Sequence, residues 1–353
     1  MIGKKGIHIS DAGIEEGRRD HHLHAAADPA LLAAERGIRA VKLSFLALAA
    51  TALIQVAIVF FSGSVALLAD TVHNFGDAAT ALPLWVAFRL GRLPPTKGFT
   101  YGYGRAEDLA GLAIVLVIVA GAVFTGYESV MRLYEPASVG ILWAVALASI
   151  MGFVGNEAVA VYRMRVGREI NSAALVADGL HARADGLTSL AVLFGAVGVW
   201  AGYPRADPLV GLIITVVILH IGWRSGRMVL TRLVDGVDPE VVDGVRAAAG
   251  SAPGVEEVSG VKVRWLGHRL RAEINVIVDP DLTVEEGHKI AKEVGHQLLR
   301  SLPYLSEATV HVDPPGAPGE AYHRDDHMDD HMDDHMDDHQ DLGGPTGRGV
   351  RRP

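Results

Sequence analysis

Six long apolar runs between residues 43 and 223 limit what this chain can fold into. A helix needs about 20 mostly apolar residues to cross the hydrocarbon core of a bilayer. The runs that meet or approach this length span residues 43–61, 65–88, 109–126, 139–162, 173–201 and 209–223. They predict an α-helical membrane protein with six transmembrane helices in residues 40–230.

The orientation of these helices follows from the positive charges in the short loops. Lys and Arg gather before the first run, between the second and third, between the fourth and fifth, and after the sixth. These residues are Arg36, Arg39, Lys42, Arg89, Arg92, Lys97, Arg105, Arg163, Arg165, Arg168, Arg224, Arg227 and Arg232. Loops rich in Lys and Arg stay in the cytoplasm. We therefore expect a multi-pass protein of the cell (inner) membrane with both termini cytoplasmic.

Residues 231–316 differ in pattern from the apolar runs. PEVVDGVRAAAG and VEEGHKIAKEVGHQLLRSL have helical spacing, whereas VEEVSGVKVRWLG, LRAEINVIVD and EATVHVDP alternate like strands, with a turn near Gly267. The order helix–strand–strand–helix–strand predicts a small α+β domain.

The two ends of the chain are polar. Residues 1–39 form a segment that contains histidines and lacks the apolar core of a signal peptide. Residues 317–353 are of low complexity, with nine Asp and one Glu against four Arg, and they hold much of the net charge of −9. The tail repeat places histidines at His327, His331, His335 and His339. This composition permits either a disordered acidic tail or a weak, multivalent collector of metal ions.

The pattern A-D-x-x-H-x-x-x-D occurs twice, at 69–77 and 177–185, each time inside an apolar run. On a helix the positions i, i+3 and i+7 share one face. The two stripes are Asp70, His73, Asp77 and Asp178, His181, Asp185. A lone charge at mid-bilayer costs about 2.5–3.5 kcal/mol, so the stripes are expected to face each other and share a cation. A His and an Asp four residues apart on each helix supply two nitrogens and two oxygens, a set that fits tetrahedral Zn²⁺.

Other interpretations of the stripes compete with a metal site. Polar residues in membrane helices also serve as interhelical hydrogen bonds, and carboxylates with histidines also form proton relays. An enzyme is disfavoured because four ligands would close the metal site and the chain has no H-E-x-x-H motif. The chain has no cysteine, so any metal site must use other ligands, and no organic cofactor is expected. Transport needs no ATP motif, and no phosphate-binding G-x-x-x-x-G-K-[ST] is present. In the fourth run, Glu157 is interpreted as an interfacial residue and Asn156 as a polar neighbour of the pore.

The sequence resembles the cation diffusion facilitator family of divalent-metal/proton antiporters. The resemblance covers about residues 40–315 and rests on SGSVALLADTVHNFGD, YGYGRAEDLAGL, NSAALVADGLHARADGLTSLAVL, RWLGHRLRAEINV and VHVDP. It implies a homodimer, a cytoplasmic ferredoxin-like domain that dimerises, and a transport site between helices two and five. Carried over by position, that site is His73, Asp77, His181 and Asp185. Asp70 and Asp178 then have accessory roles.

The resemblance also implies metal sites in the cytoplasmic domain. His288, His311 and Asp313 match ligand positions of the family, and His268 is a further candidate. Lys262 and Asn275 stand where relatives have ligands, which argues against a full binuclear site. For His268 and His296 an ordinary surface histidine is the competing interpretation.

These features predict a secondary transporter that exports Zn²⁺ from the cytoplasm in exchange for protons. Affinity order alone does not exclude Cd²⁺, Co²⁺, Ni²⁺ or Fe²⁺ as the substrate. A metal sensor that binds without transporting is the alternative from another class. No nucleic-acid partner is expected.

Overall fold

The computed structural model describes residues 29–62, 81–134 and 142–316. The predictions for Asp70, His73 and Asp77, for the N-terminal histidines and for the tail histidines His327, His331, His335 and His339 lie outside these residues.

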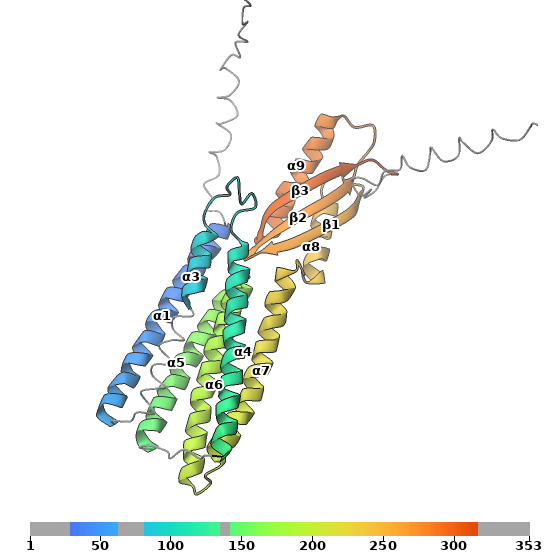
Figure 1. Ribbon diagram of the computed structural model, residues 1–353. Helices are drawn as coiled ribbons and strands as arrows, with labels where there is room; N and C mark the ends of the chain where they lie inside the picture. Colours follow the sequence, from blue (N-terminus) through green and yellow to red (C-terminus); the bar gives the residue numbers. More distant parts are fainter. Residues whose placement is uncertain (1–28, 63–80, 135–141, 317–353) are drawn as a thin grey trace, which may run out of the picture.

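A bundle of long helices forms one part of the molecule, and a small sheet domain sits at one end of it (Figure 1). The bundle contains α1 (Pro29–Ser62), α3 (Ala81–Leu90), α4 (Arg105–Tyr134), α5 (Leu142–Glu169), α6 (Ala173–Trp200) and α7 (Ala206–Leu233). Within the described residues, five of these helices are long and apolar enough to cross a membrane, and α3 is a shorter apolar helix. The α-helical membrane fold predicted from the sequence is confirmed. Of the second predicted run, only the part in α3 is described.

The membrane helices extend past the apolar runs because polar residues complete their ends. The first turn of α4 contains Glu107 and Asp108, whose charges suit the positive end of the helix dipole. The first turn of α6 is capped by Ser172, whose Oγ accepts a hydrogen bond from the Leu175 amide at 3.1 Å. This cap fixes where α6 begins, and so fixes the turns on which Asp178, His181 and Asp185 lie.

Glycines bring α5 and α6 into close contact. A Cβ atom added at Gly179 would lie 2.7 Å from Cγ of Met164 and 3.0 Å from its backbone nitrogen. One added at Gly186 would lie 3.3 Å from Cβ of Asn156. Small residues at the interface are the usual means by which membrane helices approach each other. The helix with the second motif is therefore held tightly against α5.

The C-terminal domain has the predicted order of elements. These are α8 (Pro239–Gly250), β1 (Glu257–Leu266), β2 (Arg269–Ile277), α9 (Val284–Ser301) and β3 (Leu305–Asp313). The sheet order is β1-β2-β3, with β1 and β2 antiparallel and β2 and β3 parallel. Gly267 forms the turn between β1 and β2 with φ +63°, a conformation that glycine adopts without strain. The prediction of a ferredoxin-like α+β domain is confirmed.

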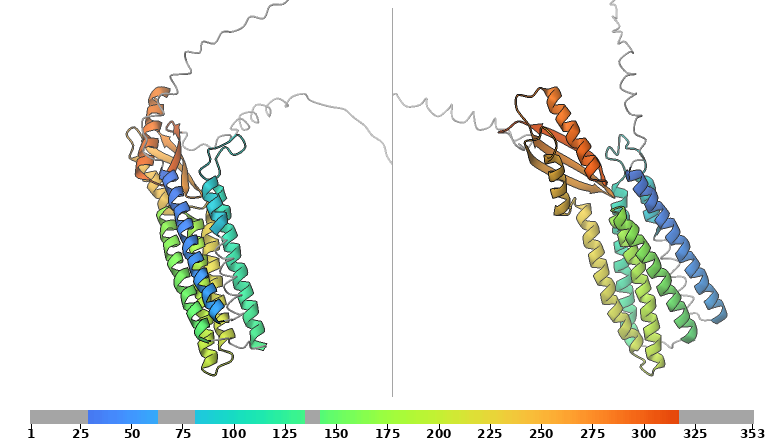
Figure 2. Two further views of the ribbon diagram at one scale, coloured as in Figure 1. Left: turned by 90° about the vertical axis from the view of Figure 1, so that its left-hand side faces the viewer. Right: turned by 180° about the vertical axis from the view of Figure 1, so that it is seen from behind.

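Both helices of this domain lie on one side of its sheet, and the apolar side chains between them form its core (Figure 2). The amphipathic pattern of α8 and α9 explains this arrangement, because their buried residues, such as Val245, Val294 and Leu298, share the face that meets the strands.

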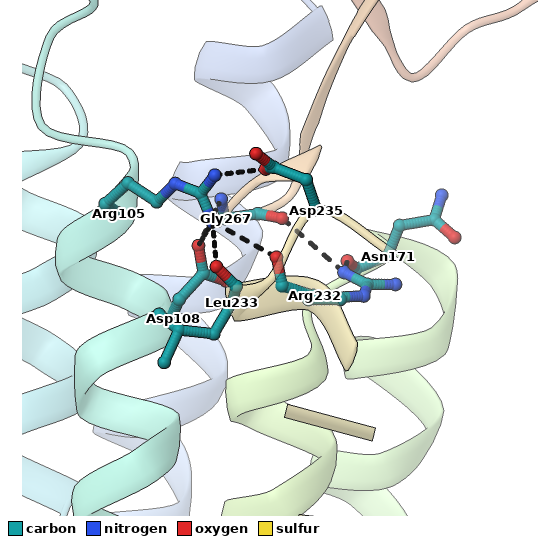
Figure 3. A network of polar contacts seen from close by, with 7 residues as sticks. All are labelled: Arg105, Asp108, Asn171, Arg232, Leu233, Asp235 and Gly267. Atoms are coloured by element: carbon teal, nitrogen blue, oxygen red, sulfur yellow. Dashed lines mark hydrogen bonds and ion pairs between the residues drawn. The ribbon is translucent and has the colours of Figure 1, made fainter. Parts of the chain in front are cut away.

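A polar network joins the sheet domain to the bundle (Figure 3). The hairpin turn at Gly267 donates its amide to Oδ2 of Asp108 at 3.2 Å. Arg105, at the start of α4, donates to the Arg232 carbonyl at the end of α7 at 3.1 Å and forms an ion pair with Asp235. The network fixes the ends of α4 and α7 against the turn between β1 and β2.

Candidate metal site

His181 and Asp185 lie one above the other on α6, as the spacing of the second motif predicts. The His181 Nδ1 and the Asp185 Oδ1 are 3.5 Å apart, and both side chains are largely shielded from solvent. The Asp185 carbonyl accepts a hydrogen bond from the Ser189 hydroxyl at 3.2 Å. An imidazole nitrogen and a carboxylate oxygen at this spacing are suited to bind one divalent cation together.

Asp178 forms an ion pair with Arg163 of α5, with 3.0 Å between its Oδ2 and the Arg163 Nη1. Both side chains are fully buried, at 0% and 1% exposure. Assigning Arg163 to a positively charged loop was wrong, because α5 continues to Glu169 and carries Arg163 into the helix packing. A buried carboxylate needs a partner. The apolar residues around Asp178 in the sequence were therefore a signal that a partner should exist.

Glu157 lies in the middle of α5 and pairs with Arg183 of α6, with 3.1 Å between its Oε2 and the Arg183 Nε. The interpretation of Glu157 as an interfacial residue at a helix end was wrong for this reason. Arg183 stands between the two α6 candidates and was missed from the sequence, although a charge inside an apolar run was a signal that a partner should exist. Asn156, which precedes Glu157 on α5, is buried and packs against α6 at Gly186.

In the cytoplasmic domain, two of the candidate ligands lie together. The His311 Nε2 is 2.7 Å from Oδ1 of Asp313, at the end of β3. His288 is exposed on α9. Asn275, one of the two residues that stand where relatives have ligands, lies opposite His311 in the pairing of β2 with β3.

His268 has a different environment from these residues. Its Nδ1 is 2.7 Å from Oε2 of Glu107, and both side chains are at least 95% buried where the hairpin meets α4. The interpretation of His268 as an ordinary surface histidine was wrong, because the docking of the hairpin on the bundle covers it. The structure places His268 in the contact between the two domains, away from the His311–Asp313 pair on β3.

Within residues 29–62, 81–134 and 142–316, no group of three or more His, Asp or Glu side chains is arranged to hold a metal ion. A metal ion held by His181 and Asp185 would need further ligands for four-coordination. The first motif, His73 and Asp77, belongs to the stretch that is not described.

Comparison with known proteins assigns the two parts of the chain separately. Residues 41–234 match the family model of the cation efflux transmembrane domain, and residues 237–315 match that of the cation efflux protein, cytoplasmic domain. A probable cation efflux system protein of Mycobacterium tuberculosis is 52% identical over 296 residues, which cover 83% of this chain and 89% of that protein. The manganese efflux system protein MneP of Bacillus subtilis is 25% identical, over 80% of this chain and 99% of its own.

Among solved structures, a cadmium form of a MamM CTD variant resembles part of the chain. It has 28% sequence identity and a TM-score of 0.21, and it covers 22% of this chain and 95% of its own.

Proposed function

Because this chain belongs to the cation efflux family, also called the cation diffusion facilitators, we propose that it exports Zn²⁺ from the cytoplasm in exchange for protons. Membership makes it an integral, multi-pass transporter of metal cations with a cytoplasmic C-terminal domain. The choice of zinc, the exchange for protons and the identity of the ligands are the content of the proposal.

The observation that carries the proposal is the pair His181 and Asp185 inside a membrane helix. Their Nδ1 and Oδ1 atoms are 3.5 Å apart on one face of α6, shielded from solvent by the packing of the bundle. The sequence repeats this spacing at His73 and Asp77. We infer that these four residues form the transport site, since two imidazole nitrogens and two carboxylate oxygens make a closed set that suits Zn²⁺.

Proton exchange follows from the chemistry of the same ligands. An imidazole must be neutral and a carboxylate ionised to bind metal, so protons and Zn²⁺ compete for the site. In the proposed cycle, Zn²⁺ binds when the site opens to the cytoplasm, and protons help to release it when the helices rearrange toward the other side. Asp70, Asp178 and Asn156 act as accessory residues beside the ligands in this proposal.

The test is uptake of single metals into proteoliposomes with an imposed pH gradient. We expect Zn²⁺ uptake that depends on the gradient, and loss of uptake in Asp185→Ala and in Asp77→Ala. Glu169→Ala is a matched control, because this carboxylate pairs with Arg165 at the exposed end of α5. Transport by Asp185→Ala at the rate of the unsubstituted protein would contradict the site.

The same assay separates the other candidates for the transported ion. Preferred uptake of Mn²⁺, Cd²⁺, Co²⁺, Ni²⁺ or Fe²⁺ would retain the site and change the substrate, because affinity order alone does not select among these ions. Binding of metal without uptake would identify a sensor.

Two further parts of the proposal concern the ends of the protein. We propose that the cytoplasmic domains pair in a homodimer and that His288, His311 and Asp313 bind additional metal there. We also propose that the tail residues His327, His331, His335 and His339 collect metal weakly and raise its local concentration near the transporter. Deletion of residues 320–353 is then expected to raise the zinc concentration for half-maximal uptake and to leave the maximal rate nearly unchanged.

A further inference from the structure

One face of α7 is left uncovered by the rest of the described chain. α7 packs on α4 and α6 with its other faces. On the uncovered face, Ile213 and Val216 are 63% and 67% exposed, and they follow each other at helical spacing. The same face continues through His220 to Arg224 and Arg227, close to the end of the helix. It is therefore an apolar stripe that ends in two positive charges.

The two arginines lie three residues apart, so their guanidinium groups leave the helix on the same side. Both are exposed, and within the described part of the chain neither has an ion-pair or hydrogen-bond partner. Like charges at this spacing on a helix repel each other. The pair of charges is thus expected to attract a counter-ion.

Beside the arginines, α7 and the cytoplasmic domain enclose a groove with a volume of about 780 Å³. Arg224, Arg227 and Arg232 line it, and Asp238 is its acidic residue. Arg232 stacks on Trp265 of β1, which also lines the groove, with its Cζ 4.5 Å from the ring centroid. Because the Arg232 guanidinium also donates to the Asn171 carbonyl, Arg224 and Arg227 are the cations of the groove that are open to a bound anion.

The position of the groove favours one source of that anion. Trp223, which also lines the groove, is 71% exposed next to Arg224. Tryptophan is enriched where a membrane helix passes the headgroup layer. The exposed apolar stripe of α7, with Ile213 and Val216, begins beside the arginines and runs away from them along the helix. A free phosphate bound at the arginines would not contact this stripe. A lipid would place its acyl chain along Ile213 and Val216 and its phosphate at the arginines.

We propose that this groove binds an anionic phospholipid, with the headgroup phosphate held by Arg224 and Arg227 and an acyl chain along α7. Arginine suits this role because its planar fork donates two parallel hydrogen bonds to phosphate oxygens. The groove is bordered by Gly236 and Val237, in the connection between α7 and the cytoplasmic domain. A bound lipid would therefore contact both parts of the protein.

The test is native mass spectrometry of the full-length protein in detergent, titrated with dioleoyl phosphatidylglycerol. We expect a tightly retained lipid whose affinity falls by about tenfold or more in Arg224→Gln/Arg227→Gln, as befits the loss of two basic contacts to an anionic lipid. Dioleoyl phosphatidylcholine should bind weakly to both proteins. Arg165→Gln/Arg168→Gln is the matched control, since it removes two arginines at the same spacing from the charged end of α5, and it should bind phosphatidylglycerol normally.

Four results would overturn the proposal. They are unchanged phosphatidylglycerol binding in the Arg224→Gln/Arg227→Gln variant, an equal loss in the control, displacement of the lipid by millimolar inorganic phosphate, and conversion of a dimer to a monomer by the α7 substitutions. The third result would indicate a site for a soluble anion, and the fourth an interface with a second copy of the chain. Unchanged circular dichroism and elution volume of the variant establish that it is folded.

Discussion

Arg163 of α5 and Asp178 of α6 form a fully buried ion pair one helical turn from His181, with 3.0 Å between Nη1 and Oδ2. The pair lies in the contact between α5 and α6, the helix that carries the candidate ligands His181 and Asp185. It leaves the Arg163 Nε and Nη2 without hydrogen-bond partners among the described residues. Removing one member of such a pair strands a buried charge, whereas removing both does not.

Arg163→Met should therefore destabilise the protein by about 3–5 kcal/mol, as breaking a buried ion pair does. The double variant Arg163→Met/Asp178→Leu should recover much of this loss, because neither charge is then left unpaired. The measurement is thermal unfolding of the purified variants in one detergent. Equal stability of Arg163→Met and the unsubstituted protein would show that the pair does not contribute to the fold.

A second prediction concerns ion selectivity and rests on the proposed transport site. His181→Asp would replace a nitrogen by an oxygen, so the site would hold one nitrogen and three oxygens. Harder, more anionic sites suit Mn²⁺ better relative to Zn²⁺. We expect the ratio of zinc to manganese uptake to fall several-fold in single-metal flux assays. An unchanged ratio would place ion selection elsewhere in the protein.

The sequence predicted the elements of this fold more completely than the partners of its buried charges. Apolar run length predicted the long helices, and alternation predicted β1, β2 and β3, because both patterns depend on local burial. The partners of Asp178 and Glu157 were missed, since which charged side chains meet depends on how α5 rotates against α6. The burial of His268 was missed for a similar reason, because it results from the docking of a hairpin on a helix 161 positions away in the chain. The closeness of His181 and Asp185 could be predicted because one helix carries both residues, whereas their role as metal ligands stays a prediction.

A third prediction tests the contact between α5 and α6. Gly179→Ala would place a Cβ 3.0 Å from the Met164 backbone nitrogen and 3.1 Å from the Ala160 carbonyl oxygen, so the helices must move apart. We expect a loss of about 1–3 kcal/mol in stability, as for overpacked cores. Gly121→Ala on α4 is the matched control, because nothing lies within 4 Å of its added Cβ. It should be neutral or slightly stabilising in the same thermal unfolding measurement, and a loss of equal size at both positions would contradict the packing argument.

A fourth prediction concerns the loop before α4 and its contact with the sheet. The Tyr101 ring contacts two arginines that pair across β1 and β2, with 5.0 Å from its centroid to Cζ of Arg264 and 4.7 Å to Cζ of Arg271. Each cation–π contact at an exposed site is worth about 0.5–1 kcal/mol. Tyr101→Leu should raise hydrogen exchange in residues 91–104 of the full-length protein several-fold, whereas Tyr101→Phe, which keeps the ring, should not. The same rise in both variants would indicate that the hydroxyl and not the ring holds the loop.

The last prediction concerns the pH dependence of the start of α9. The Thr283 hydroxyl and amide both donate to Oε2 of Glu286, at 2.7 Å and 2.9 Å, and the Glu286 amide donates back to the Thr283 Oγ1 at 3.3 Å. The hydrogen bond from the Thr283 side chain, followed by that from its amide, lowers the pKa of Glu286 below the usual value of a glutamate. The folded protein therefore favours the ionised carboxylate more than the unfolded chain does. The stabilisation is complete above the ordinary glutamate pKa and disappears as the pH falls through the lowered value.

We therefore expect protection of the first α9 amides against hydrogen exchange, corrected for intrinsic rates, to decrease as the pH falls through this range. Thr283→Ala removes both the hydroxyl donor and the cap acceptor, so it should reduce protection at neutral pH by the loss of a helix cap, about 1 kcal/mol. It should also weaken the pH dependence, because Glu286 then ionises closer to its ordinary pKa. Thr283→Ser keeps the hydroxyl and should restore both properties. A pH profile in Thr283→Ala that matches the unsubstituted protein would assign the dependence to another carboxylate.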